Sequence, residues 1–119
     1  MKIKKENIVK TKSFLFSVRI VNLYKFLIQE KKEFIISKQL LRSGTSIGAL
    51  VRESEHAEST ADFIHKLSIA LKEANETEYW LDLLKETDYL SKSEYLSIQE
   101  NIKELLKLLI SIIKSTKLK

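Results

Sequence analysis

The sequence predicts an all-α fold, and two features of the chain support this class. The 119 residues include no proline and only two glycines, so the residues that most strongly interrupt helices are nearly absent. Apolar residues recur at spacings of three and four along most of the chain, which is the period of an α-helix. A chain of this length can bury a core of its own. We therefore expect a single four-helix-bundle domain over residues 1–119.

The first predicted helix covers about residues 12–31 and has an unusually wide apolar surface. Its apolar positions form two neighbouring stripes, namely Phe16, Ile20, Leu23 and Leu27, and Phe14, Val18, Val21 and Ile28. The second predicted helix covers about residues 37–56, with Ser37 as its N-cap. It contains both glycines, Gly44 and Gly48, one helical turn apart.

The third and fourth predicted helices begin at recognisable caps. Ser59 with Asp62 three residues later resembles a capping box before a helix over about residues 60–87. Its core stripe has heptad spacing: Phe63, Leu67, Ala70, Ala74, Thr77, Leu81 and Leu84. Ser91 with Glu94 predicts a second capping box, which begins a helix over about residues 92–115.

Four helices joined by short polar turns favour an antiparallel up-down-up-down bundle, which places both chain ends together. Residues 1–12 carry five lysines and one glutamate, and so do residues 103–119, a net charge of +4 each. The whole chain has a net charge of +5, so the middle is acidic by −3. We therefore expect two basic, flexible ends that meet as one patch of about +8.

Lysine clusters without interleaved aromatic residues predict phosphate-directed binding of RNA or DNA with little sequence readout. The predicted nucleic-acid-binding residues are Lys2, Lys4, Lys5, Lys10, Lys12, Lys114, Lys117 and Lys119. The chain has no cysteine, which fits a reducing compartment. Its N-terminus lacks the apolar core of a signal peptide, and the run LLKLLISIIK is too short to span a bilayer. We expect a cytoplasmic protein with no membrane partner.

The last helix suggests self-association. Between Leu105 and Ile113 only Lys107 and Ser111 are polar, which leaves most of the helix circumference apolar. Apolar surface of this extent usually marks an interface, so a homo-oligomer is favoured. The alternative is a central, heavily buried helix in a compact monomer.

Charged residues border the predicted core on the second and third helices. Arginines and glutamates on facing helices can form bidentate ion pairs that fix the register of a bundle. We favour a structural polar network over a ligand site, which remains the alternative. The predicted network consists of Gln39, Arg42, Arg52, Glu53, Asp62, Lys66, Glu73 and Glu76.

Other motifs favour structural over chemical roles. The small residues 43–48 lack the lysine of a phosphate-binding loop, so Gly44 and Gly48 more simply allow close helix packing. Two carboxylate–histidine pairs, Glu53 with His56 and Asp62 with His65, have metal-ligand spacing. Both lie at one predicted turn, away from the middle of the bundle, and the first helix offers only Glu30 as a further carboxylate, so metal binding is a distant alternative.

We expect no enzymatic activity, no cofactor and no resident metal, because no nucleophile with an adjacent base is recognisable. Trp80 beside Tyr79 is interpreted as a packing anchor. A base-stacking platform would require these two rings to be exposed.

The strings RSGTSIGA, ADFIHKLSIALKEA and ETEYWLDLL resemble the four-helix-bundle family of 23S ribosomal RNA intervening-sequence proteins. The resemblance implies a homopentameric barrel, an architecture shared with accessory proteins of diversity-generating retroelements, which bind nucleic acid and a reverse transcriptase. The pattern of that family falls on residues 39–53 and 61–80, including Ser46, Ile47, Ala61, Phe63, Tyr79 and Trp80. Leu50 stands where relatives commonly have asparagine, so any role of that amide is absent.

Together these observations predict a non-catalytic, homo-oligomeric protein that binds RNA or DNA through its lysine-rich end. The rival hypothesis is a structural scaffold that holds a nucleic-acid enzyme such as a reverse transcriptase, with the lysines serving solubility. A metal-binding bundle comes third.

Overall fold

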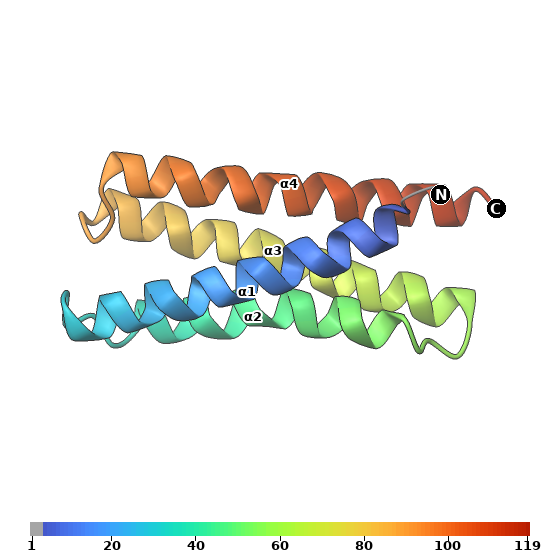
Figure 1. Ribbon diagram of the computed structural model, residues 1–119, viewed down its shortest axis with the longest axis horizontal. Helices are drawn as coiled ribbons and strands as arrows, with labels where there is room; N and C mark the ends of the chain where they lie inside the picture. The colour runs from blue at the N-terminus through green and yellow to red at the C-terminus, as the bar shows by residue number, and fades with distance from the viewer. Residues whose placement is uncertain (1–3) are drawn as a thin grey trace.

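The computed structural model describes residues 4–119, which form a bundle of four long helices (Figure 1). The helices are α1 (Lys5–Gln29), α2 (Ile36–Ser54), α3 (Thr60–Glu86) and α4 (Lys92–Lys117). All four run along the 47 Å axis of a molecule that measures 24 and 22 Å across. Contacts join α1 to α2, α2 to α3, α3 to α4 and α4 to α1, so α1 and α3 occupy opposite corners.

The four helices agree with the predicted order, and the largest difference in bounds is at the start of α1. This helix begins at Lys5, well before residue 12, because lysine and glutamate are good helix formers and no breaker precedes the apolar stripe. The start of α1, the α2–α3 connection and the end of α4 lie at the same end of the bundle, here called the shared end (Figure 1). None of the helices within residues 4–119 is both long and apolar enough to cross a membrane.

The helix starts confirm two predicted caps and correct a third. Ser91 and Glu94 form a complete capping box at α4, and the Ser59 hydroxyl accepts a hydrogen bond from the Asp62 amide at α3. At α2, Ser37 is not the N-cap. The buried Glu33 carboxylate accepts instead from the amides of Ile35, Ile36 and Ser37, at 3.2, 3.0 and 2.6 Å. A glutamate before the helix thus satisfies the amides that the predicted serine cap would have satisfied.

The core follows the predicted stripes. Six of the seven heptad residues of α3 are buried, and Phe63 is half-buried at the edge. On α4, the apolar positions that surround the helix are largely covered within the chain, since Leu105, Leu109, Ile112 and Ile113 are all buried. The α1 helix differs, because its second stripe is only partly covered by the rest of the bundle.

The two glycines of α2 allow a close approach to α1, as the small-residue spacing predicts. A Cβ atom on Gly44 would lie 2.8 Å from the Ile20 side chain, and one on Gly48 would lie 3.1 Å from the Ser13 carbonyl oxygen. Ile20 is fully buried and β-branched, so it has little freedom to move away. Residues 43–48 are therefore a helix-packing surface and not a phosphate-binding loop.

Candidate nucleic-acid interface

The structure brings the predicted lysines to the shared end from two helices. Lys4 precedes α1, and Lys5, Lys10 and Lys12 lie in its first turns, while Lys114, Lys117 and Lys119 lie at the end of α4. Lys2 lies outside the described residues. Neighbouring positions of α1 and α4 are joined by a hydrogen bond from Lys5 Nζ to Ser111 Oγ of 2.6 Å. The two basic segments are thus adjacent in space although they are more than 100 positions apart in sequence.

The lysines differ in how far they are already paired. Lys10 Nζ lies 3.1 Å from a carboxylate oxygen of Glu55, and Lys12 Nζ lies 3.1 Å from one of Glu104. These pairs are partly exposed, so they reduce the local positive charge without fixing the lysines firmly. The other lysines form no ion pair within residues 4–119 and are exposed: Lys4, Lys5, Lys114, Lys117 and Lys119. The positive charge available to a phosphate is therefore concentrated on the outermost residues of the two chain ends.

The same end also carries acidic side chains, which the prediction of a uniform +8 patch did not include. The α2–α3 connection and its flanking turns contribute Glu53, Glu55, Glu58 and Asp62. Glu53, Glu58 and Asp62 line a shallow hollow together with His56 and Lys66. The shared end thus has a basic half, formed by α1 and α4, and an acidic half, formed by the α2–α3 connection.

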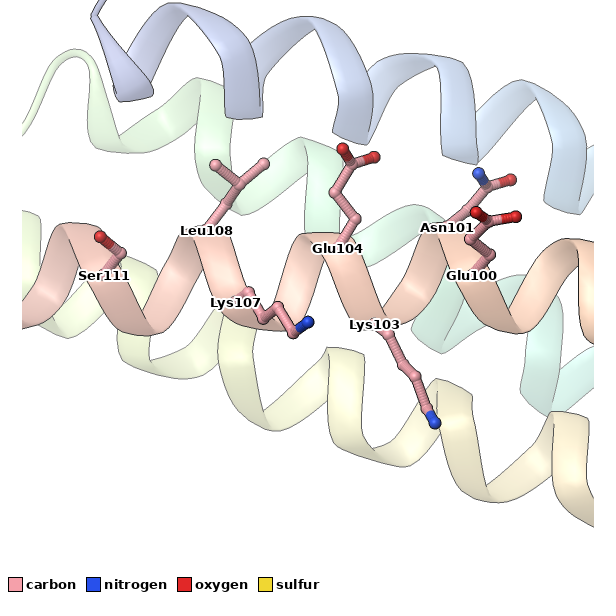
Figure 2. Close-up of a pocket in the computed structure, with 7 residues that line it drawn as sticks. All are labelled: Glu100, Asn101, Lys103, Glu104, Lys107, Leu108 and Ser111. Carbon is pink, nitrogen blue, oxygen red and sulfur yellow. The ribbon is translucent and has the colours of Figure 1, made fainter.

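An open hollow of mixed charge lies along the outer side of α4 (Figure 2). In Figure 2, Glu104 and Asn101 point toward α1, whereas Lys103 projects to the other side of the helix. All seven lining residues belong to α4, so the hollow is an open surface. Glu104 is already paired with Lys12, and Ser111 accepts a hydrogen bond from Lys5, so the hollow suits charge recognition more than chemistry.

The predicted polar network forms only one ion pair between α2 and α3 within residues 4–119, between Lys66 and Glu53 at 3.5 Å. Asp62 instead accepts a hydrogen bond from the Glu58 amide at 3.1 Å. Arg52 lies over the Phe14 ring of α1, 5.7 Å from its centroid. The predicted network is therefore not buried. Its exposed members are Gln39, Arg42, Arg52 and Glu53, and its half-buried members are Asp62, Lys66, Glu73 and Glu76.

A neutral contact joins α2 and α3 in the core. The Thr77 hydroxyl donates a hydrogen bond to Ser43 Oγ at 2.9 Å, and both residues are fully buried. Sequence reasoning placed Thr77 on the core stripe and Ser43 in the small-residue run, but it did not pair them. The pairing could have been predicted, because each of the two facing buried stripes carries a hydroxyl and a buried hydroxyl needs a hydrogen-bond partner.

The aromatic pair of α3 divides into one buried and one exposed ring. Trp80 is half-buried against the core, and its Nε1 donates to Glu76 at 3.1 Å. Tyr79 packs edge-on against Trp80 with 4.9 Å between ring centroids and is 57 % exposed. Trp80 is thus a packing anchor, while the face of Tyr79 is open to a partner.

The shifted pKa values belong to structural contacts. Hydrogen bonds from the Ser91 amide and hydroxyl lower the pKa of Glu94, and a hydrogen bond to Asp82 raises the pKa of Tyr95 to about 12. These groups fix the start of α4 and its contact with α3. Within the described part of the chain, no three histidine or carboxylate side chains lie close enough to hold one metal ion, although Glu53, His56, Glu58 and Asp62 line the same hollow.

Comparison with known proteins identifies the family. The family model described as 23S rRNA-intervening sequence protein matches residues 5–111. The chain belongs to this family. It is also similar to the crystal structure, at 1.70 Å resolution, of a protein of unknown function from the S23 ribosomal protein family of Bacteroides thetaiotaomicron. That protein is 66 % identical, with a TM-score of 0.92 over 93 % of this chain and 99 % of the other. No curated protein matches this chain.

The membership confirms the resemblance that the sequence strings carried and agrees with the all-helical four-helix bundle. It covers nearly the whole of α1 to α4. Because the similar crystal structure is of a protein of unknown function, it supports the fold and not an activity.

Proposed function

We propose that this chain is a non-catalytic, cytoplasmic protein that self-associates as antiparallel bundles and binds RNA or DNA through its lysine-rich chain ends. One observation carries the proposal: the fold brings five exposed lysines without an ion pair to one end of the molecule, namely Lys4, Lys5, Lys114, Lys117 and Lys119. Exposed lysines on a common surface attract the phosphate backbone without reading bases. The family name refers to an intervening sequence of 23S rRNA, so RNA is the first ligand to test.

Self-association is supported by exposed apolar side chains at mid-length on α1. Phe14, Leu15 and Val18 are 53 %, 59 % and 45 % exposed, and they lie within about one turn of each other. The resemblance implies a ring of five copies. In such a ring each copy would contribute one lysine-rich end, so the attraction for phosphate would add across the assembly.

The test is a filter-binding titration of a 23S rRNA fragment and a duplex DNA at increasing salt. Binding is expected at low ionic strength, with affinity falling steeply as salt rises. A variant with Lys4, Lys114, Lys117 and Lys119 changed to glutamine should lose most of this affinity. The matched control changes Lys32, Lys38 and Lys92, which are exposed lysines at the opposite end. Absence of binding by the unaltered protein at low salt would overturn the proposal.

The second candidate is a scaffold that holds a protein partner such as a nucleic-acid enzyme. It is favoured by the mixed charge of the α2–α3 surface and by the exposed ring of Tyr79, which suit a protein more than a polyanion. The lysine variant separates the two functions. Loss of RNA binding with the oligomer intact supports the first, whereas unchanged binding supports the second.

A further inference from the structure

The outer side of α1 carries a stripe of exposed residues, here called the outer stripe, which the rest of the bundle contacts at its edge, where Arg52 lies over Phe14. Its members recur at helical spacing: Lys4, Asn7, Thr11, Phe14, Leu15, Val18, Asn22 and Lys25. The centre is apolar, and both ends are polar. A stripe with spacings of three and four residues suits another helix that lies alongside it. Exposed apolar side chains at its centre indicate that a partner covers the outer stripe.

The outer stripe is not complementary to itself. Its only ionisable side chains are Lys4 and Lys25, and it contains no carboxylate. If two copies packed symmetrically through the stripe, centred on residue 16, Lys4 of one would lie about 4.5 Å along the axis from Lys25 of the other. Like charges at this separation repel, so a symmetric pair through α1 is disfavoured.

The opposite side of the bundle offers a complementary face, here called the α2–α3 seam. It carries most of the predicted network: Gln39, Arg42, Glu53, Asp62, Lys66, Glu73 and Glu76. The side chains of Gln39, Arg42 and Glu73 form no hydrogen bond or ion pair within residues 4–119. At the shared end, the seam continues into Glu58. Such charges are available to a partner because the chain itself does not pair them.

The two faces also match in height along the bundle axis. The contacts of α2 with Ile20 and Ser13 of α1, and with Thr77 and Lys66 of α3, give the relative heights. They place Phe14 about level with Ile69, and Ser46 one turn farther from the shared end, about level with Val18.

Ser46 and Ile69 lie on the α2–α3 seam, at helical spacing from its charged members, and both are half-buried. Ile69 offers the Phe14 ring an apolar contact, and the short side chain of Ser46 leaves room for Val18. The same alignment places Lys4 near the height of the first turn of α3, where the Glu58 amide bonds Asp62. The centre of the outer stripe thus meets a small and an apolar residue, while its basic end meets a carboxylate.

We propose that the outer stripe of α1 packs along the α2–α3 seam of a second copy. This inference rests on the self-association in the proposed function and names its two faces. The contact is heterologous, because unlike surfaces meet, and such contacts repeat from copy to copy until a ring closes. The acidic end of the seam then acts between copies, where Glu58 and Asp62 come near Lys4 of the stripe. The apolar centre provides the burial, and the charges fix the height.

The test uses two variants, each of which alters one face. Val18→Asp places a charge in the outer stripe, and Ser46→Lys fills the α2–α3 seam. Leu96→Asp is the matched control, because Leu96 is 50 % exposed on α4, away from both faces. Masses are measured by light scattering after size exclusion, and helicity by circular dichroism. Val18→Asp and Ser46→Lys should each run as the 13.9 kDa monomer, while Leu96→Asp should keep the mass of the unaltered protein.

The decisive measurement is an equimolar mixture of Val18→Asp and Ser46→Lys. The mixture retains one intact face of each kind, and its two altered faces carry opposite charges, so its mass should rise above that of the monomer. Recovery on mixing also shows that both variants are folded. If either variant alone loses helicity, Thr11→Asp and Arg42→Glu alter the same two faces at exposed positions.

Three results would overturn the inference. Val18→Asp that keeps the mass of the unaltered protein would show that α1 is not in the interface. Ser46→Lys that stays a dimer without mixing would show a symmetric contact through α1. Dissociation by Leu96→Asp would place the interface on α4. In all three cases the unaltered protein is an oligomer, so the proposed function survives. A monomeric unaltered protein would instead remove the self-association itself.

Discussion

The α1 helix contacts its two neighbours in different ways. Against α2 it packs through backbone and short side chains, with Gly44 facing Ile20 at a separation that excludes a Cβ atom. Against α4 it is joined by long polar side chains, such as Arg19 to Asn101 at 2.7 Å and Lys12 to Glu104 at 3.1 Å. Hollows open on both sides of Arg19 along this second junction. The α1–α2 junction is thus close at Gly44, although a hollow opens beside it at Phe14 and Arg52, whereas the α1–α4 junction is polar and open.

The difference shows which contact fixes the outer stripe in place. Close packing transmits position because buried side chains in their rotamers cannot shift without strain. Exposed ion pairs and hydrogen bonds allow more movement and contribute less free energy. We therefore expect α2 to position α1 and α4 to tether it. The predictions below test this asymmetry through the free energy of unfolding, measured by urea denaturation at a fixed protein concentration.

The largest effect is expected at the close junction. Gly44→Val should lower the free energy of unfolding by about 3 kcal/mol, because the added side chain overlaps the fully buried Ile20. Ala49→Val is the control on the exposed side of the same helix, and it should cost roughly 0.5 kcal/mol from helix propensity. A double change of Gly44→Val with Ile20→Ala should recover part of the loss. Equal effects at positions 44 and 49 would contradict the close packing.

The close packing of α1 against α2 could be predicted from the sequence, whereas the polar contacts between α1 and α4 could not. Two glycines one turn apart have few structural explanations, so Gly44 and Gly48 predicted the close approach. The hydrogen bonds of Arg19 depend on which residues of α4 face α1, which no local pattern gives. The same reason explains why the network on α2 and α3 was expected to be internal. Spacing shows that charges share a face, but not whether they pair within one chain.

The helix caps could likewise be predicted only where all their contacts are local. The capping box at Ser91 is local, since all its partners lie within four residues, and it was predicted correctly. The start of α2 was assigned to Ser37 because serine is a common N-cap. The buried Glu33 carboxylate was missed, since its reach over three amides depends on the shape of the turn. On α4, apolar residues around the helix suggested exposure, but neighbouring helices cover most of them.

The next effect is expected at the connection that leads from α1 into α2. Glu33→Gln should lower the free energy of unfolding by about 1 to 2 kcal/mol, because the amide accepts less strongly from three backbone N–H groups. Ser37→Ala should cost less, since its hydroxyl bonds only the Glu33 carbonyl oxygen. A larger loss for Ser37→Ala would contradict the assignment of Glu33 as the cap.

The same carboxylate predicts a dependence on pH. Burial alone would raise the pKa of Glu33, but the amides of Ser37, Ile36 and Ile35 together hold the pKa below its ordinary value of 4.5. The folded state therefore binds this proton more weakly than the unfolded state. The stabilisation is complete above pH 4.5 and is lost as the pH falls through the lowered pKa. In Glu33→Gln, the acid-induced loss of stability should be smaller than in the unaltered protein.

A smaller effect is expected at the open junction. Arg19→Ala should cost about 1 kcal/mol, because the guanidinium donates to Asn101 and to the Ser97 hydroxyl at 2.8 Å. Arg19→Lys should recover only part of this loss, since an ammonium cannot make both bonds in the same planar geometry. Lys103→Ala is the control, because Lys103 is exposed on α4 and projects away from α1 (Figure 2). A loss at Arg19 that exceeds the loss at Gly44 would reverse the proposed asymmetry.

The smallest effect is expected for the ion pair between Lys12 and Glu104. Both side chains are more than 40 % exposed, so Lys12→Gln should change the free energy of unfolding by about 0.5 kcal/mol or less. The change should vanish at high salt, which screens exposed charges. The same substitution removes a lysine from the predicted nucleic-acid interface, so its effect on RNA affinity can be measured with the fold intact. A weaker complex without lower stability would show that Lys12 serves the phosphate more than the tether to α4.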